Sequence, residues 1–236
     1  MTPTPRSMFA AALVLAAPLS SCASGPPPEP EPAPSLDPAR EALLLEARTR
    51  LDFPVRVVFD WYSNEAGTRA SGRGVARIAP PDRVRLDLFL ENGEIAAKAA
   101  MIGRELRLPD GAPEEILPPP DFMWGALGFF RPILGSTLIE VESFADGSLR
   151  FRYRLDDRRE LRYRAAGSDL VEVEMTESGH VVQRIRTEHD DEDFPKSARY
   201  RNMAEFRELR IERAAVERIE SFPMDIWDPR VAPRGR

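Results

Sequence analysis

The sequence predicts a mainly β (α+β) protein: a strongly curved antiparallel sheet or open β-barrel of about eleven strands, with an N-terminal helix and a central helical lid. Three observations support this fold class. Apolar and polar residues alternate with a period of two over most of residues 55–219, turn signals recur at hairpin spacing, and a helical, aromatic-rich insert interrupts the alternation once.

Residues 1–21 have the features of a secretory signal peptide. Arg6 is their only charge, and residues 8–17 form an apolar run shorter than the roughly 20 residues that span a bilayer. Cys22 is the only cysteine, so it has no partner for an internal disulfide. The stretch LSSC that ends at Cys22 resembles the lipobox of bacterial lipoproteins, in which the cysteine sulfur receives a diacylglycerol and the new amino terminus is acylated, as with palmitate. The resemblance implies lipidation of Cys22; the alternative is an ordinary signal peptide with a cysteine in its tail.

A proline-rich tether is predicted over residues 22–35. It contains GPPPEPEPAP, which favours extended polyproline II geometry and cannot build a core. The chain has a formal net charge of −6 and is a poor match for nucleic acid. Ala23 follows the cysteine, and in proteobacterial lipoproteins a residue other than Asp at this position permits delivery to the outer membrane. We therefore expect a lipid-anchored envelope protein, in the outer membrane and facing the periplasm.

A single amphipathic helix is predicted over residues 38–51. Asp37 suits the N-cap and Pro38 suits the first helical position. The expected apolar face consists of Leu43, Leu44, Ala47 and Leu51.

Five strands are predicted after the helix. They cover residues 55–63, 71–79 and 82–93, and two short strands lie within residues 94–111 around a turn near Gly103. The third strand alternates most clearly. Its expected apolar face carries Val84, Leu86, Leu88 and Leu90, and its expected polar face carries Arg85, Asp87 and Glu91.

The insert over residues 112–135 has prolines near both ends and an apolar, aromatic centre. We predict a short helix from Asp121 to Phe130 followed by an apolar loop. Glycines and Pro132 weaken its helix propensity, which suits a lid that opens at low cost. Two other interpretations stay open: a plain core plug, and apolar residues that insert into a membrane.

Six further strands are predicted over residues 148–157, 159–167, 169–178, 180–190, 196–203 and 208–219. Phe151, Tyr153 and Val173 fall on their apolar face. The other face carries an arginine stripe beside a glutamate stripe, and such residues pair across strands at about 0.2–1 kcal/mol a pair. We expect a solvated outer face; the alternative is a surface that binds polyanions.

A curved sheet of this size encloses more apolar surface than one helix covers, so the N-terminal helix, the insert or a ligand must fill the rest. The order of elements, the run GRGVARIAPPDRVRLDLFLENG and the ending ELRIERAAVERIESFPMDIWDP resemble the LolA/LolB lipoprotein-localisation factors over residues 36–229. Residues 230–236 form a C-terminal tail.

The resemblance implies a membrane-anchored protein that holds acyl chains of a lipid or lipoprotein in an apolar cavity during transfer, with a periplasmic carrier protein as a possible partner. The expected cavity and lid residues are Leu86, Leu88, Phe122, Trp124, Leu127, Phe130, Phe151, Tyr153 and Val173. Soluble carriers of this family lock an empty lid with a buried arginine. Arg56, Arg69 and Arg73 lie in the corresponding half of this chain, and no local motif chooses among them.

No enzymatic activity, cofactor or metal is predicted. The sequence lacks Gly-x-Ser-x-Gly, HExxH and phosphate-loop motifs. The acidic run over residues 188–193 fits a hairpin turn better than a cation site, because it has no spaced glycine or second ligand set. The alternative function is a non-catalytic structural or scaffold lipoprotein of the envelope with a filled core.

Overall fold

The computed structural model describes residues 36–112 and 117–230. The predicted signal peptide, Cys22 and the tether lie outside these residues, as does most of the C-terminal tail. Within the described ranges, no helix has the length and apolar character needed to cross a membrane.

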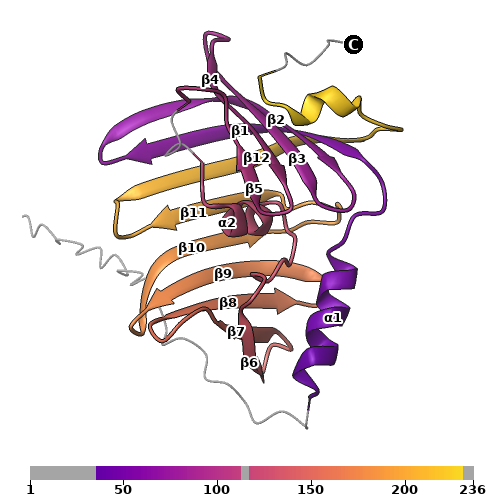
Figure 1. Cartoon of the computed structure of the whole chain (residues 1–236), viewed down its shortest axis with the longest axis vertical. Helices are drawn as coiled ribbons and strands as arrows, with labels where there is room; N and C mark the ends of the chain where they lie inside the picture. The colour runs from indigo at the N-terminus through magenta and orange to yellow at the C-terminus, as the bar shows by residue number, and fades with distance from the viewer. Residues whose placement is uncertain (1–35, 113–116, 231–236) are drawn as a thin grey trace, which may run out of the picture.

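The described residues form one curved, unclosed antiparallel sheet of twelve strands, which confirms the predicted fold class (Figure 1). The strands are β1 Val55–Glu65, β2 Thr68–Ala79, β3 Arg83–Leu90, β4 Ile95–Ile102, β5 Glu105–Arg107, β6 Thr137–Ser143, β7 Leu149–Arg154, β8 Arg159–Ala166, β9 Asp169–Glu177, β10 His180–Glu188, β11 Ser197–Asn202 and β12 Arg207–Arg218.

The topology explains why a helix crosses the sheet. The strand order is β5-β4-β3-β2-β1-β12-β11-β10-β9-β8-β7-β6, so β5 and β6 are the two edges although they follow each other in the chain. The connection over residues 108–136 therefore runs from one edge to the other. Helix α2 (Pro120–Ala126) lies in this connection and packs against β9, β10 and β11 on the apolar, concave face.

Helix α1 (Pro38–Arg48) begins as predicted but buries a different face. The Asp37 carboxylate accepts hydrogen bonds from the first free amides of the helix, Ala39 N (3.1 Å) and Arg40 N (3.3 Å). The predicted apolar face was wrong for three of its four residues, because Leu43 is 68% exposed and Leu44 and Ala47 are also exposed. The fourth, Leu51, is half-buried against the core, but it lies beyond the helix, which ends at Arg48 and not at residue 51. The buried positions are Ala42, Leu45 and Thr49, and the helix lies against β6.

Strand β6 (Thr137–Ser143) is the element that the sequence analysis missed. A register shift between Leu138 and Glu140 interrupts its pairing with β7, and the adjacent apolar residues Leu138 and Ile139 break the alternation near its start. Its side chains are half-buried or exposed, as expected for an edge strand.

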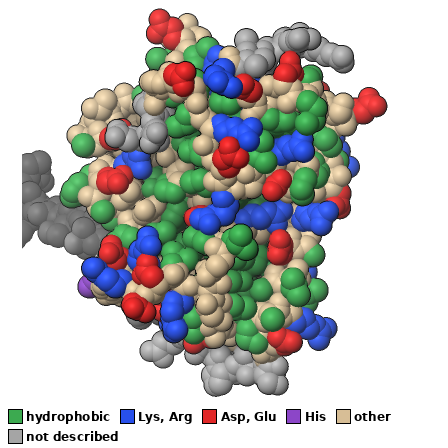
Figure 2. Space-filling view, viewed as in Figure 1, with side chains coloured by type: hydrophobic (Ala, Val, Ile, Leu, Met, Phe, Trp, Pro, Cys, Tyr) green, Lys and Arg blue, Asp and Glu red, His purple; other side chains and the backbone are tan. Residues whose placement is uncertain are grey.

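The convex face carries the predicted arginine–glutamate pairs. Arg184 contacts Glu174 at 2.5 Å and Arg186 contacts Glu172 at 2.7 Å, both between β10 and β9. This pairing agrees with a solvated outer face. Figure 2 shows the molecule from the side seen in Figure 1, where basic and acidic side chains both lie among apolar ones.

Glu208 is the centre of the densest of these clusters. Its carboxylate accepts hydrogen bonds from Arg199 (2.9 Å), Arg201 (3.0 Å) and Arg210. Partial burial favours the neutral acid, but the three guanidinium groups outweigh it and lower the pKa of Glu208 to about 2.

The C-terminal 3-10 segment η2 (Met224–Trp227) covers the outer face of β3 and corrects a second expectation. Arg85 and Asp87 were expected on an exposed polar face, yet both are fully buried beneath it. The Arg85 guanidinium binds Asp87 (2.9 Å) and donates to the carbonyl of Ile226 (2.8 Å). Arg77 also contacts Asp87 at 2.6 Å, so the buried charges compensate each other.

Candidate functional site

The lid, defined here as residues 120–131, consists of α2 and the turn that follows it. Pro120 occupies the first helical turn, where its missing N–H costs nothing. The helix was predicted to continue to Phe130 but ends at Ala126, because Gly128 takes a left-handed conformation (φ +86°). A Cβ at Gly128 would lie 3.0 Å from Pro195 Cδ, so the close contact with the 189–196 loop also requires glycine.

Two polar contacts hold the start of the lid to the turn between β4 and β5. The Arg104 guanidinium donates to both carboxylate oxygens of Asp121, each at 2.9 Å. The indole Nε1 of Trp124 donates to the carbonyl of Gly103 at 2.7 Å. These contacts fix the helix across the β3–β5 end of the hollow.

Three contacts hold the C-terminal end of the lid to the other side of the sheet, at α1 and β8. The amide of Phe130 donates to the Thr49 hydroxyl (3.1 Å) just after α1, and the Tyr163 hydroxyl of β8 donates to the carbonyl of Arg131 (3.0 Å). Arg131 also lies 3.6 Å from the carboxylate of Glu46. The lid is thus held mainly at its two ends.

Between these ends, apolar side chains of the lid fill the concave face. Phe122 stacks edge-on against Tyr200 with ring centroids 5.6 Å apart, and Phe130 packs against Phe151 at 5.3 Å. A Cβ at position 125 would lie only 2.8 Å from Val173 Cγ2, so Gly125 permits the close approach of α2 to β9.

The surroundings of the lid are apolar. Burial raises the pKa of Tyr153 to about 12, and it raises the pKa of the fully buried Tyr163 well above its usual value of 10.0. Both phenols therefore stay neutral at physiological pH.

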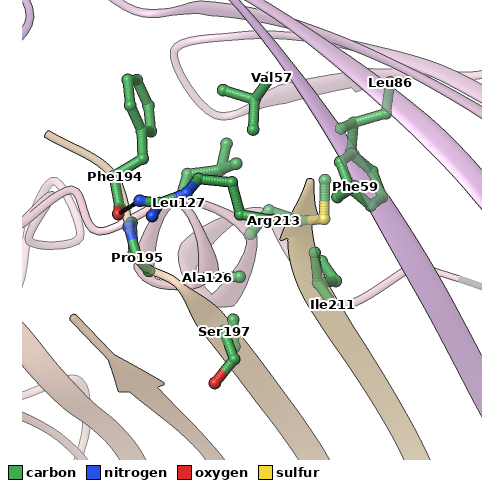
Figure 3. A pocket seen from close by; sticks show the side chains of 12 residues that line it. Val57, Phe59, Leu86, Ala126, Leu127, Phe194, Pro195, Ser197, Ile211 and Arg213 are labelled. Carbon is green, nitrogen blue, oxygen red and sulfur yellow. Dashed lines mark hydrogen bonds between the residues drawn. The ribbon is translucent and has the colours of Figure 1, made fainter. Parts of the chain in front are cut away.

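All nine predicted cavity and lid residues lie in or against one hydrophobic core. They do not line one shared cavity. Phe151 and Tyr153 of β7 pack on Phe130, while Leu86 of β3 and Leu127 line a small cavity between the lid and strands β1, β3, β11 and β12 (Figure 3). Leu88, Phe122, Trp124 and Val173 are buried in the packed core.

The cavity measures about 40 Å³. One water molecule occupies about 30 Å³ of liquid, and pockets for small ligands usually measure about 300–1,000 Å³. With the lid in this position, this cavity is too small for an acyl chain, so an acyl chain can occupy this part of the concave face only if the lid moves.

Sequence reasoning missed three residues at this cavity. Phe194, 2% exposed, stacks edge-on against Phe129 at 6.0 Å, and Pro195 contacts the lid at Gly128. Arg213 donates to the carbonyl of Phe194 and to the carboxylate of Asp190 (2.5 Å). Two features of the sequence could have indicated these residues. Phe194 and Pro195 are an apolar pair directly after the acidic run, and Arg213 follows Leu209 and Ile211 with the period of two that places strand residues on one face.

The other predicted polar candidates take structural places. Residues 189–196 form the loop between β10 and β11, as the acidic run suggested, and the described residues contain no group of His, Cys, Asp and Glu suited to a metal. Arg56 pairs with Glu217 and Arg73 with Asp60, at exposed positions, and Arg69 is also exposed. The arginines that hold the lid in place are instead Arg104, which binds Asp121, and Arg131 of the lid itself, which lies near Glu46.

The sequence matches no protein-family model and no curated protein. Its structure is similar to that of a LolA superfamily protein from Nitrosomonas europaea, with a TM-score of 0.55 and 12% identity over 80% of this chain and 96% of that one.

Two solved structures match less closely. A domain from Vibrio parahaemolyticus, provisionally named an outer membrane lipoprotein-sorting protein, has a TM-score of 0.47 and 10% identity over 81% of this chain and 94% of that one. A DUF1329 family protein from Desulfovibrio piger has a TM-score of 0.41 and 11% identity, covering 83% and 98%. The unclosed sheet, the helix across its concave face and the Nitrosomonas europaea likeness together show that this chain has the LolA-like fold.

Proposed function

We propose that this protein binds acyl chains of a lipid or lipoprotein in the hollow between the concave face of the sheet and the lid. One observation carries the proposal. The apolar face of a twelve-stranded, unclosed sheet is covered across its middle by a helix of seven residues, and not by a second layer of secondary structure. The concave face thus becomes available to a ligand when one short segment moves.

The physical chemistry of the lid supports movement. Isolated helices shorter than about 12–15 residues are marginal in water, so α2 depends on its packing for stability. Its N-cap residue, Pro119, makes no side-chain hydrogen bond to the helix. An incoming acyl chain offers about 0.8 kcal/mol for each buried methylene, and it can replace the apolar contacts that the lid makes when closed.

The proposal includes the setting of the protein. We propose that Cys22 is lipidated, that the protein is anchored in the outer membrane facing the periplasm, and that it receives its cargo there from a periplasmic carrier. The lipobox-like stretch that ends at Cys22 supports the anchor. The role is non-catalytic: the protein holds and transfers a ligand without altering it.

A second candidate is a scaffold lipoprotein with a permanently filled core. The observation that favours it is the cavity of about 40 Å³, together with the full burial of Phe122 and Phe130. In that case the lid is a core plug, and the protein acts through its outer surface.

Lipid extraction separates the two candidates. A chain that starts at residue 22 and carries Cys22→Ser is purified without detergent, extracted with organic solvent and analysed by mass spectrometry. We expect acyl lipid that co-purifies with the protein, or uptake of added dodecanoate by delipidated protein. Absence of both, in a protein that is folded by circular dichroism, contradicts the carrier function and favours the scaffold.

A further inference from the structure

Arg213 lies on the concave, apolar face of the sheet. Cross-strand partners share a face, and Arg213 pairs with Phe59 of β1 while Ile211 pairs with Trp61. The register between β1 and β12 shifts beyond this point, since Val58 pairs with Ala215 and Ala214 is left without a partner in β1. Arg213 therefore continues the inward row of Leu209 and Ile211, and its neighbour Glu212 is exposed.

The surroundings of Arg213 are those of a binding site for an amphiphile. It is the only charged residue among those that line the cavity, whose other walls include Val57, Phe59, Leu86 and Leu127. Its side chain is 11% exposed. Figure 3 shows it extending along the cavity wall toward the Phe194 carbonyl.

Asp190 supplies the negative charge that a guanidinium on an apolar wall requires. Its carboxylate accepts from Arg213 Nη2 at 2.5 Å, yet its side chain is 38% exposed and belongs to the loop over residues 189–196. The hydrogen bond from Arg213 lowers the pKa of Asp190, so this carboxylate is charged at physiological pH. Because the Asp190 side chain of this pair reaches solvent, water and salt screen its attraction to Arg213, and another anion can take its place.

We propose that the ligand of this hollow is an amphiphile with an anionic head group, a carboxylate or a phosphate. The head group binds the Arg213 guanidinium in place of the Asp190 carboxylate. The acyl chain lies along Phe59 and Leu86, in the space that Leu127 and the lid leave on opening. This inference rests on the proposed acyl-chain function and adds the class of ligand and the residue that selects it.

The test compares three probes with the same chain of twelve carbons: dodecanoate, dodecyl phosphate and dodecanol. Affinities are measured by tryptophan fluorescence on the chain that starts at residue 22 and carries Cys22→Ser. A charge-assisted hydrogen bond discriminates by roughly tenfold or more, so at least one anionic probe should bind that much more tightly than dodecanol. The anion that binds better identifies the head group.

Four variants show whether Arg213 causes the preference for anionic probes. Arg213→Gln should remove this preference, so that the anionic probes bind no more tightly than dodecanol, and Arg213→Lys should restore part of the preference. Arg210→Gln, on the outer face of the same strand, is the matched control and should leave all affinities unchanged. Asp190→Asn removes the competing carboxylate and should raise the ratio of anion to dodecanol affinity.

The outcomes are distinguishable. Equal binding of all three probes by the parent chain overturns the inference and leaves the acyl-chain function standing. An anion preference that survives in Arg213→Gln, or an Asp190→Asn variant that binds all probes more tightly by the same factor, also overturns it, since Arg213 would then only clamp the loop. Binding of none of the probes contradicts the proposed function itself.

Discussion

Replacing Trp124 by alanine distinguishes a lid from a core plug. Trp124 is 3% exposed, its indole donates to the Gly103 carbonyl at 2.7 Å, and its ring packs edge-on against Phe129 at 5.6 Å. In a rigid core, removing such a side chain costs about 3–5 kcal/mol of the free energy of unfolding, out of about 5–15 kcal/mol in total. In a lid, the loss is limited to the free energy of lid opening, because the variant can keep its sheet folded with the lid open.

Trp61 provides the matched control. It is also 3% exposed, and its indole donates to the carbonyls of Arg73 and Phe89, both at 3.1 Å, but it lies on β1 in the centre of the sheet. We expect Trp61→Ala to lose about 3–5 kcal/mol in urea denaturation, and Trp124→Ala to lose less than about 3 kcal/mol and to retain bound dodecanoate poorly. Equal losses in the two variants, with dodecanoate retention unchanged, would refute the lid.

Three further predictions concern the lid contact, the convex face and the anchor. Asp121→Asn breaks the bidentate contact with Arg104, whose side chain is 46% exposed, and should ease lid opening by about 1 kcal/mol, measured as roughly fivefold faster dodecanoate uptake; unchanged uptake counts against it. Glu208 has a folded-state pKa of about 2, below its ordinary 4.5, so its contribution to stability is complete above about pH 4.5 and is lost as the pH falls toward 2. The stability difference between the parent and Glu208→Gln in urea denaturation should therefore be present at pH 7 and disappear between these values, and a constant difference would contradict the assignment. Intact mass of the mature chain should show a diacylglyceryl-modified Cys22 that is absent in Cys22→Ser, whereas an unmodified thiol would exclude the anchor.

The sequence predicted the sheet well because its concave face is defined by strict alternation. Leu86 and Leu88 on β3, and Phe151 and Tyr153 on β7, are buried on the face that the period of two assigns to them. Where a bulge breaks the period, the prediction failed. The shift near Leu138 hid strand β6.

The sequence pattern also could not predict burial that is caused by a segment far away in the chain. Arg85 and Asp87 occupy outward positions on β3, and they are buried only because η2, about 140 residues later in the chain, packs over them. Leu43 and Leu44 were assigned to the buried face of α1 from their helical spacing with Ala47 and Leu51. The helix instead packs through Ala42 and Leu45, next to β6.

The central claim is that the lid opens while the sheet stays folded, and amide hydrogen exchange measured by mass spectrometry tests it most directly. Amides of residues 120–131 should exchange well before those of β1 and β12, because lid opening requires less free energy than global unfolding. Saturating dodecanoate should change exchange in this segment and leave the central strands as they were. Exchange of residues 120–131 only together with β1 and β12, with no effect of dodecanoate, would contradict the claim and identify the lid as a permanent part of the core.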